Sequence, residues 1–78
     1  MRDQEWNREF SRRLRCKMNE RLIKQKALCE LTDISQPSMS KYMKGFQVPN
    51  SYELHKIARA LECSTDELIN FDESDYYY

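Results

Sequence analysis

The sequence predicts an all-α fold of five helices in one compact domain. Three observations support this prediction: apolar residues recur every three or four positions in several segments, helix-capping residues separate those segments, and the 78 residues include only one glycine and two prolines. A composition so poor in turn-forming residues argues against a β fold. The chain is too short for a second hydrophobic core, so residues 1–71 are expected to form a single domain.

A first helix is expected in the N-terminal part of the chain. Its apolar stripe consists of residues spaced four apart, Trp6, Phe10, Leu14 and Met18. Five arginines occupy its other faces, namely Arg8, Arg12, Arg13, Arg15 and Arg21. These side chains can either reach phosphates or form an ordinary solvated face, and the sequence leaves both interpretations open. Leu22 and Ile23 end the helix and are expected to fill the core.

The segment from Lys24 to Gly45 predicts two short helices joined by a tight turn. The buried face of the earlier helix is given by three residues at helical spacing, Leu28, Leu31 and Thr32. The sequence Asp33-Ile34-Ser35 then interrupts this pattern. Asp33 is among the few non-glycine residues that tolerate left-handed backbone angles at the end of a helix.

The next helix is expected to begin at Gln36. Ser35 can cap it, because its hydroxyl accepts a hydrogen bond from a free amide of the first turn, where the missing N–H of Pro37 costs nothing. Gly45 then allows the chain to reverse. The inward side chains are Met39, Tyr42 and Met43, and the outward ones are Gln36, Pro37, Ser38, Lys41 and Lys44. Outward amide, hydroxyl and ammonium groups can bond base edges and phosphates of DNA.

These residues resemble the lambda-repressor-like (Cro/XRE) helix-turn-helix DNA-binding domain. The resemblance extends from about Phe10 to Ile69 and rests on the joint spacing of Gln25, Cys29, Asp33-Ile34-Ser35, Met39, Gly45 and Pro49. It implies a helix-turn-helix formed by the second and third of five helices, in a repressor of phage, prophage or mobile-element type that binds a double-stranded DNA operator. Because one domain offers few base contacts, a homodimer on an inverted repeat is expected.

The chain departs from the family pattern at two places. Lys24 stands where the family often has a serine or threonine cap, so the start of the second helix is less firmly fixed. Met18 and Met43 stand where many relatives carry a paired arginine and glutamate. Because two apolar side chains can replace a buried ion pair without loss of stability, we expect Met18 and Met43 to touch in the core.

The third helix is expected to lie in the major groove of DNA. Gln36 is the first choice for reading a base, because a glutamine amide can bond to adenine N6 and N7 together. Ser38 and Lys41 come next, and the ring of Pro37 could pack on a thymine methyl group. Phosphate contacts are expected from Ser35 and Lys44 and, as the resemblance implies, from Gln25 and Gln47. Ordinary helix or loop surface is the alternative for every one of these residues.

Two further helices are expected after the loop that contains Pro49. Asn50 or Ser51 would cap the fourth helix, whose apolar face consists of Leu54, Ile57, Ala58 and Leu61. Residues 64–67, STDE, form a capping box that begins a short fifth helix. Its apolar residues are Leu68, Ile69 and Phe71. They either make the dimer contact that the resemblance implies or close a small core as a lid.

Charge is unevenly distributed along the chain. Residues 1–49 carry eleven basic and six acidic side chains, whereas residues 50–78 carry two basic and seven acidic ones. The predicted helix-turn-helix lies in the basic part, and phosphate attraction depends on this local field rather than on the net charge of zero. Residues 72–78, DESDYYY, form an acidic and tyrosine-rich tail that is expected to be disordered or to bind a partner weakly.

Other functions find little support in the sequence. It has no glycine-rich phosphate loop and no plausible catalytic set, so no enzyme activity, cofactor or small-molecule ligand is expected. Cys16, Cys29 and Cys63, with the lone His55, match no metal-ligand spacing and are expected to be buried or half-buried free thiols. No segment is apolar enough for a membrane span or a signal peptide, so a cytoplasmic location is expected. The alternative function is a protein-interaction module or antitoxin that uses the fifth helix and the tail as its partner surface.

Overall fold

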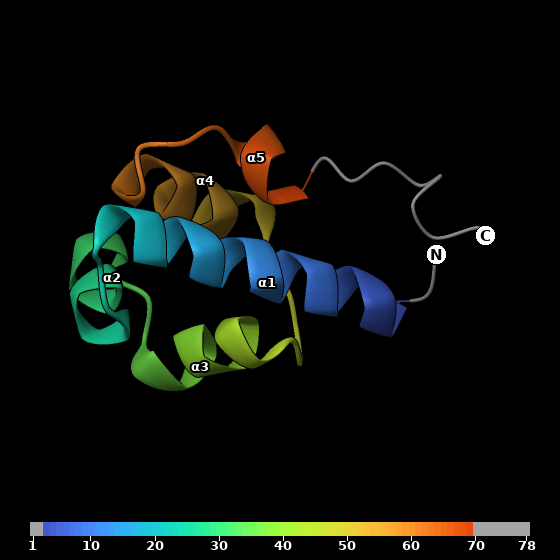
Figure 1. Cartoon of the computed structure of the whole chain (residues 1–78). Helices are drawn as coiled ribbons and strands as arrows, with labels where there is room; N and C mark the ends of the chain where they lie inside the picture. Colours follow the sequence, from blue (N-terminus) through green and yellow to red (C-terminus); the bar gives the residue numbers. More distant parts are fainter. Residues whose placement is uncertain (1–2, 70–78) are drawn as a thin grey trace.

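Five α-helices make up the fold in the computed structural model, which describes residues 3–69 (Figure 1). They are α1 (Asp3–Arg21), α2 (Gln25–Thr32), α3 (Gln36–Lys44), α4 (Ser51–Ala60) and α5 (Thr65–Ile69). The long helix α1 runs through the centre, with α3 on one side, α4 and α5 on the other, and α2 near its C-terminal end. The prediction of an all-α fold is confirmed, and residues 3–69 contain no strand.

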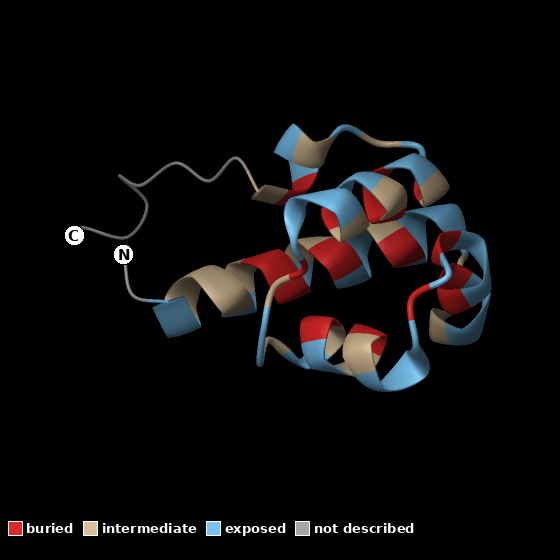
Figure 2. Cartoon of the chain, turned by 180° about the vertical axis from the view of Figure 1, so that it is seen from behind, coloured by how far each residue is buried: buried red, intermediate tan, exposed pale blue. Residues whose placement is uncertain are grey.

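The core lies around α1, on the inward faces of all five helices (Figure 2). Phe10 and Leu14 are fully buried, Met18 is almost so, and Trp6 packs against the edge of the core, as the apolar stripe predicts. The other buried apolar residues are Leu28, Cys29, Ile34, Met39, Tyr42, Leu54, Ile57, Ala58, Leu61 and Leu68. All four residues predicted for the inner face of α4 are among them.

The turn between α2 and α3 has the predicted geometry. Asp33 ends α2 in the left-handed region, with φ of 58°. Ser35 caps α3 through its hydroxyl, which accepts a hydrogen bond from the backbone N–H of Ser38 at 3.3 Å. Gly45 ends α3 with φ of 78°, a backbone conformation that costs glycine little. Local chemistry therefore sets both ends of α3.

The later caps also follow the sequence. Of the two candidates for the start of α4, Asn50 is the cap, because its side-chain oxygen accepts a hydrogen bond from the Glu53 N–H at 2.8 Å. The capping box of α5 is complete. Ser64 Oγ accepts from the Glu67 N–H at 3.3 Å, and a Glu67 carboxylate oxygen accepts from the Ser64 N–H at 2.8 Å.

Two leucines predicted to be buried are exposed, so those predictions are wrong. Leu22 is 87% exposed because it adopts a left-handed conformation (φ 57°) that ends α1 and turns its side chain outward. Ile23 packs against the core instead, and its N–H donates to Met18 O at 2.9 Å. Leu31 is 62% exposed because it lies about 200° around α2 from the buried Cys29.

The methionine and cysteine predictions have mixed outcomes. Met18 is buried and Met43 is half-buried against the core, so neither side chain stands free in solvent, while their mutual contact stays a prediction.

Cys29 is buried and Cys63 half-buried, but Cys16 is exposed, because it lies about 200° around α1 from Leu14. Within residues 3–69 no group of three potential ligand side chains could hold a metal ion.

Some predictions fall outside the described residues. These are the boundary after residue 71, the nature of the tail at 72–78 and the position of Phe71. Among residues 3–69, no helix is both long enough and apolar enough to cross a membrane.

Candidate nucleic-acid interface

The outer face of α3 is polar and open, as predicted. Gln36, Pro37 and Lys41 are exposed, and Ser38 is half-exposed. On the opposite face, Met39 is fully buried, and it fixes the helix to the core together with Tyr42 and the half-buried Met43. The side chains able to bond base edges therefore stand on a helix whose inner face is held by packing.

The first turn of α3 has a hydrogen-bond network that sequence reasoning did not specify. Besides accepting from the Ser38 N–H, the Ser35 hydroxyl donates to Ser38 Oγ at 3.0 Å. Because hydroxyl protons rotate, either serine can donate in this contact, and one of the two hydroxyl protons remains available to a ligand.

Gln25 joins the start of α2 to the start of α3. Its amide Nε2 donates to the backbone oxygen of Gln36 at 3.4 Å. Lys24, at the N-cap of α2, makes no side-chain capping bond, as its departure from the family pattern predicts. Gln25 therefore lies beside Gln36, the first candidate for reading a base.

The remaining phosphate candidates lie at the other end of α3. Lys44 is the last residue of the helix and is exposed, and Gln47 is exposed in the loop that follows. Lys44 and Gln25 line one groove together with Ser11, Arg15, Ser40 and Met43. The sequence left Arg15 open between a phosphate contact and a solvated helix face, and it did not single out Ser40, which lies next to Lys41 on the predicted third helix. Gln47 and Ser35 do not line this groove.

The residues predicted for dimerisation have different environments. Leu68 is fully buried inside the chain, which fits its alternative role as part of a lid. Ile69 is half-buried and packs against the core. The side chain of Leu68 therefore presents no surface to a partner in this structure.

A tyrosine links α3 to α4. The hydroxyl of Tyr42 donates to a carboxylate oxygen of Glu53, and burial, with this bond and the charge of Glu53, raises the Tyr42 pKa to about 12. Because Glu53 also belongs to the capped first turn of α4, the bond connects α3 to the start of α4.

Tyr42→Phe should lower the free energy of unfolding by about 1–2 kcal/mol at pH 7, since it removes a hydrogen bond to a charged group. The raised pKa means that the folded chain holds the phenolic proton of Tyr42 more tightly than the unfolded chain does. The contribution of Tyr42 to the free energy of unfolding is therefore lost as the pH rises from about 10 to 12. Urea unfolding of both proteins at pH 7, 10 and 11 measures this. The difference between them should shrink with rising pH, and a constant difference would show that Tyr42 does not titrate in this way.

Comparison with protein families gives one match. The model for a Cro/C1-type HTH DNA-binding domain matches residues 13–74, which is most of the chain and includes all of α2, α3 and α4. Comparisons with curated proteins and with solved structures gave no match. The N-terminal half of α1 precedes the matched region.

Proposed function

The chain belongs to the family of Cro/C1-type HTH DNA-binding domains and is a DNA-binding transcription regulator, and from this premise we propose that it is a sequence-specific repressor that reads its operator through α3. The observation that supports the proposal most is the outer face of α3. No part of residues 3–69 covers its polar side chains, while Met39 and Tyr42 hold its inner face in the core. A helix presented in this way fits the major groove of B-DNA.

The proposed base contacts come from the first two turns of α3. Gln36 is exposed at the N-terminal end, where recognition helices of this type contact base edges. Its amide can bond bidentately to adenine, and the hydroxyl of Ser38 and the ammonium group of Lys41 add contacts along the same face. Pro37 would pack on a thymine methyl group. Proposed phosphate contacts are Gln25, Ser35, Lys44 and Gln47, which fix the register of the protein on DNA.

We propose that the operator is an inverted repeat bound by a homodimer, with half-sites about 34–36 Å apart. Since Leu68 is buried, Ile69 is the proposed dimer contact of α5, together with Phe71, which lies outside the described residues. The burial of Leu68 also reduces the apolar surface available to the alternative function, protein binding through this helix. Gel shifts on random and genomic DNA at two salt concentrations separate the two functions, because only a sequence reader keeps a preferred site when salt rises.

Gln36→Ala should weaken binding to the selected operator by about 1–3 kcal/mol and relax the preference at one base position. The operator is first selected from a randomised duplex pool with the wild-type protein, and both proteins are then titrated on it and on single-base variants. Lys44→Ala is the matched control, because loss of a phosphate contact weakens all sequences alike and lowers the salt slope by about one unit. Equal losses on cognate and random DNA for Gln36→Ala would remove this residue from base reading.

A further inference from the structure

The basic side chains of α1 fall into two groups. Four of them pair with carboxylates: Arg12 and Arg13 with Glu9, Lys17 with Glu20 and Glu67, and Arg21 with Glu62. Arg8 and Arg15 pair with no carboxylate among residues 3–69, and Arg15 Nε donates only to the backbone oxygen of Ser11, at 3.3 Å. Two positive charges of α1 are therefore without an ion-pair partner among residues 3–69.

The two unpaired arginines lie on the side of α1 that packs against α3. Ser11 stands between them at helical spacing, and its hydroxyl donates to the backbone oxygen of Met43 at 2.6 Å. The backbones also approach closely here, since a Cβ atom at Gly45 would lie 3.5 Å from both Asn7 O and Arg8 Cα. This packing places the backbone of α1 at Arg8 and Ser11 next to the C-terminal end of α3, while the side chains of Arg8 and Arg15 stay exposed.

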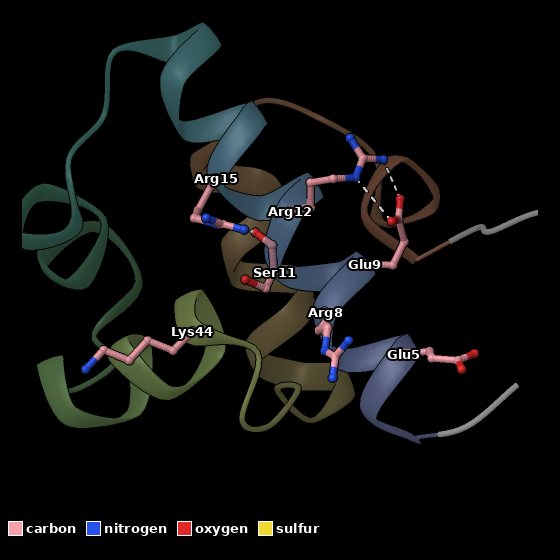
Figure 3. Close-up of a pocket in the computed structure, with 7 residues that line it drawn as sticks. All are labelled: Glu5, Arg8, Glu9, Ser11, Arg12, Arg15 and Lys44. Atoms are coloured by element: carbon pink, nitrogen blue, oxygen red, sulfur yellow. Dashed lines mark hydrogen bonds and ion pairs between the residues drawn. The ribbon is translucent and has the colours of Figure 1, made fainter. Parts of the chain in front are cut away.

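Two neighbouring grooves connect these arginines to the proposed phosphate contacts. One is lined by Arg8, Arg12, Arg15 and Lys44 with Ser11, Glu5 and Glu9, and Figure 3 shows Lys44 on one side of it and the two glutamates on the other. Arg15 and Lys44 also line the groove that contains Gln25. Glu9 bonds Arg12 and Arg13, which lower its pKa and keep it ionised, so its negative charge is offset by those two arginines. Glu5 is the other acidic side chain of this groove, and the four basic side chains outnumber the two carboxylates. The grooves thus form a continuous basic surface that begins beside α3 and continues along α1.

We propose that Arg8 and Arg15, together with Lys44, form a phosphate strip that binds the DNA backbone beyond the segment read by α3. The proposal rests on the proposed function, since α3 must lie in the groove for α1 to meet the flanking phosphates. Arg8 precedes the region matched by the family model, so its contact would be an addition particular to this chain. Guanidinium groups suit this role, because they bond phosphate oxygens with two parallel N–H groups.

Salt dependence of binding tests the strip. Each phosphate contact contributes about 0.9 to the slope of log K against log salt concentration, so Arg8→Gln and Arg15→Gln should each lower the slope by about that amount. Their preference for the selected operator over its single-base variants should stay unchanged. Arg59→Gln is the matched control, because it makes the same charge change at an exposed position on α4 outside both grooves. Its slope should equal that of the wild type.

Duplex length provides a second measurement. Adding base pairs of arbitrary sequence on both sides of the operator should tighten wild-type binding, and both glutamine variants should lose part of that gain. Arg8→Lys and Arg15→Lys keep the charge and should recover most of the wild-type slope, which separates charge from any effect on folding. If both glutamine variants keep the wild-type salt slope while the wild type still selects an operator, the phosphate strip is refuted and the proposed function is not. A wild-type protein without any sequence preference would overturn the proposed function as well.

Discussion

Met39→Ala should lower the free energy of unfolding by about 2–5 kcal/mol and should weaken DNA binding, although Met39 touches no DNA in the proposed complex. The side chain is fully buried on the inner face of α3. Its removal leaves a cavity that the close-packed core fills only in part. Alanine has a high helix propensity, so the loss comes from packing against the core rather than from the helix itself.

Urea unfolding and operator titration of the same samples measure the two effects of Met39→Ala. A small domain has a total stability of about 5–15 kcal/mol, so the expected loss is a large part of it. Met39→Leu is the control, because it keeps the volume and should cost less than about 1.5 kcal/mol. A Met39→Ala protein with the wild-type unfolding midpoint would mean that this residue does not hold α3 in place.

The features predicted correctly from the sequence are mostly local. The left-handed Asp33, the Ser35 cap and the start of α3 at Gln36 depend on residues within one or two turns of each other, and the structure confirms all of them. Capping chemistry acts on the backbone next to it, so a single sequence contains nearly all the information that it needs. The capping box of α5 is confirmed for the same reason.

The features missed depend on which elements meet in space. Leu28 and Leu31 are both leucines and are spaced three residues apart, which places them on nearly the same side of a helix. Even so, α2 buries Leu28 and leaves Leu31 exposed. Only the structure shows which basic side chains of α1 form ion pairs and which do not. Arg13 and Lys17 meet Glu67, which lies 50 or more positions further along the chain. An amphipathic pattern identifies a polar face, but it does not show where on that face charge is already neutralised.

The candidate interface also has some features that the sequence predicts and others that only the structure shows. The outward position of Gln36, Lys41 and Lys44 follows from helix periodicity and is confirmed as exposure. The hydrogen bond between the hydroxyls of Ser35 and Ser38 depends on side-chain geometry, which residue types alone leave undetermined. The groove that joins Gln25 to Arg15 needs α1, α2 and α3 to be placed together. Their roles on DNA stay predictions that the titrations above test.

Leu68→Ala should lower the free energy of unfolding by about 2–5 kcal/mol at every protein concentration. Leu68 is fully buried, and α5 is held on α1 by the Lys17 ammonium group, which lies 3.1 Å from a Glu67 carboxylate oxygen. A lid of this kind stabilises each chain by itself. Leu22→Ala is the matched control, because the same change at a side chain that is 87% exposed should shift stability by no more than about 0.5 kcal/mol.

Concentration separates the lid from a dimer contact. If Leu68 served the dimer, its loss would leave the stability of dilute monomer unchanged and lower the unfolding midpoint only at concentrations where the wild type associates. Thermal unfolding over a hundredfold range of protein concentration, with sedimentation of the same samples, decides between these outcomes. The buried position predicts parallel curves for wild type and variant, offset by a constant difference. Curves that converge on dilution would assign Leu68 to the interface between two chains.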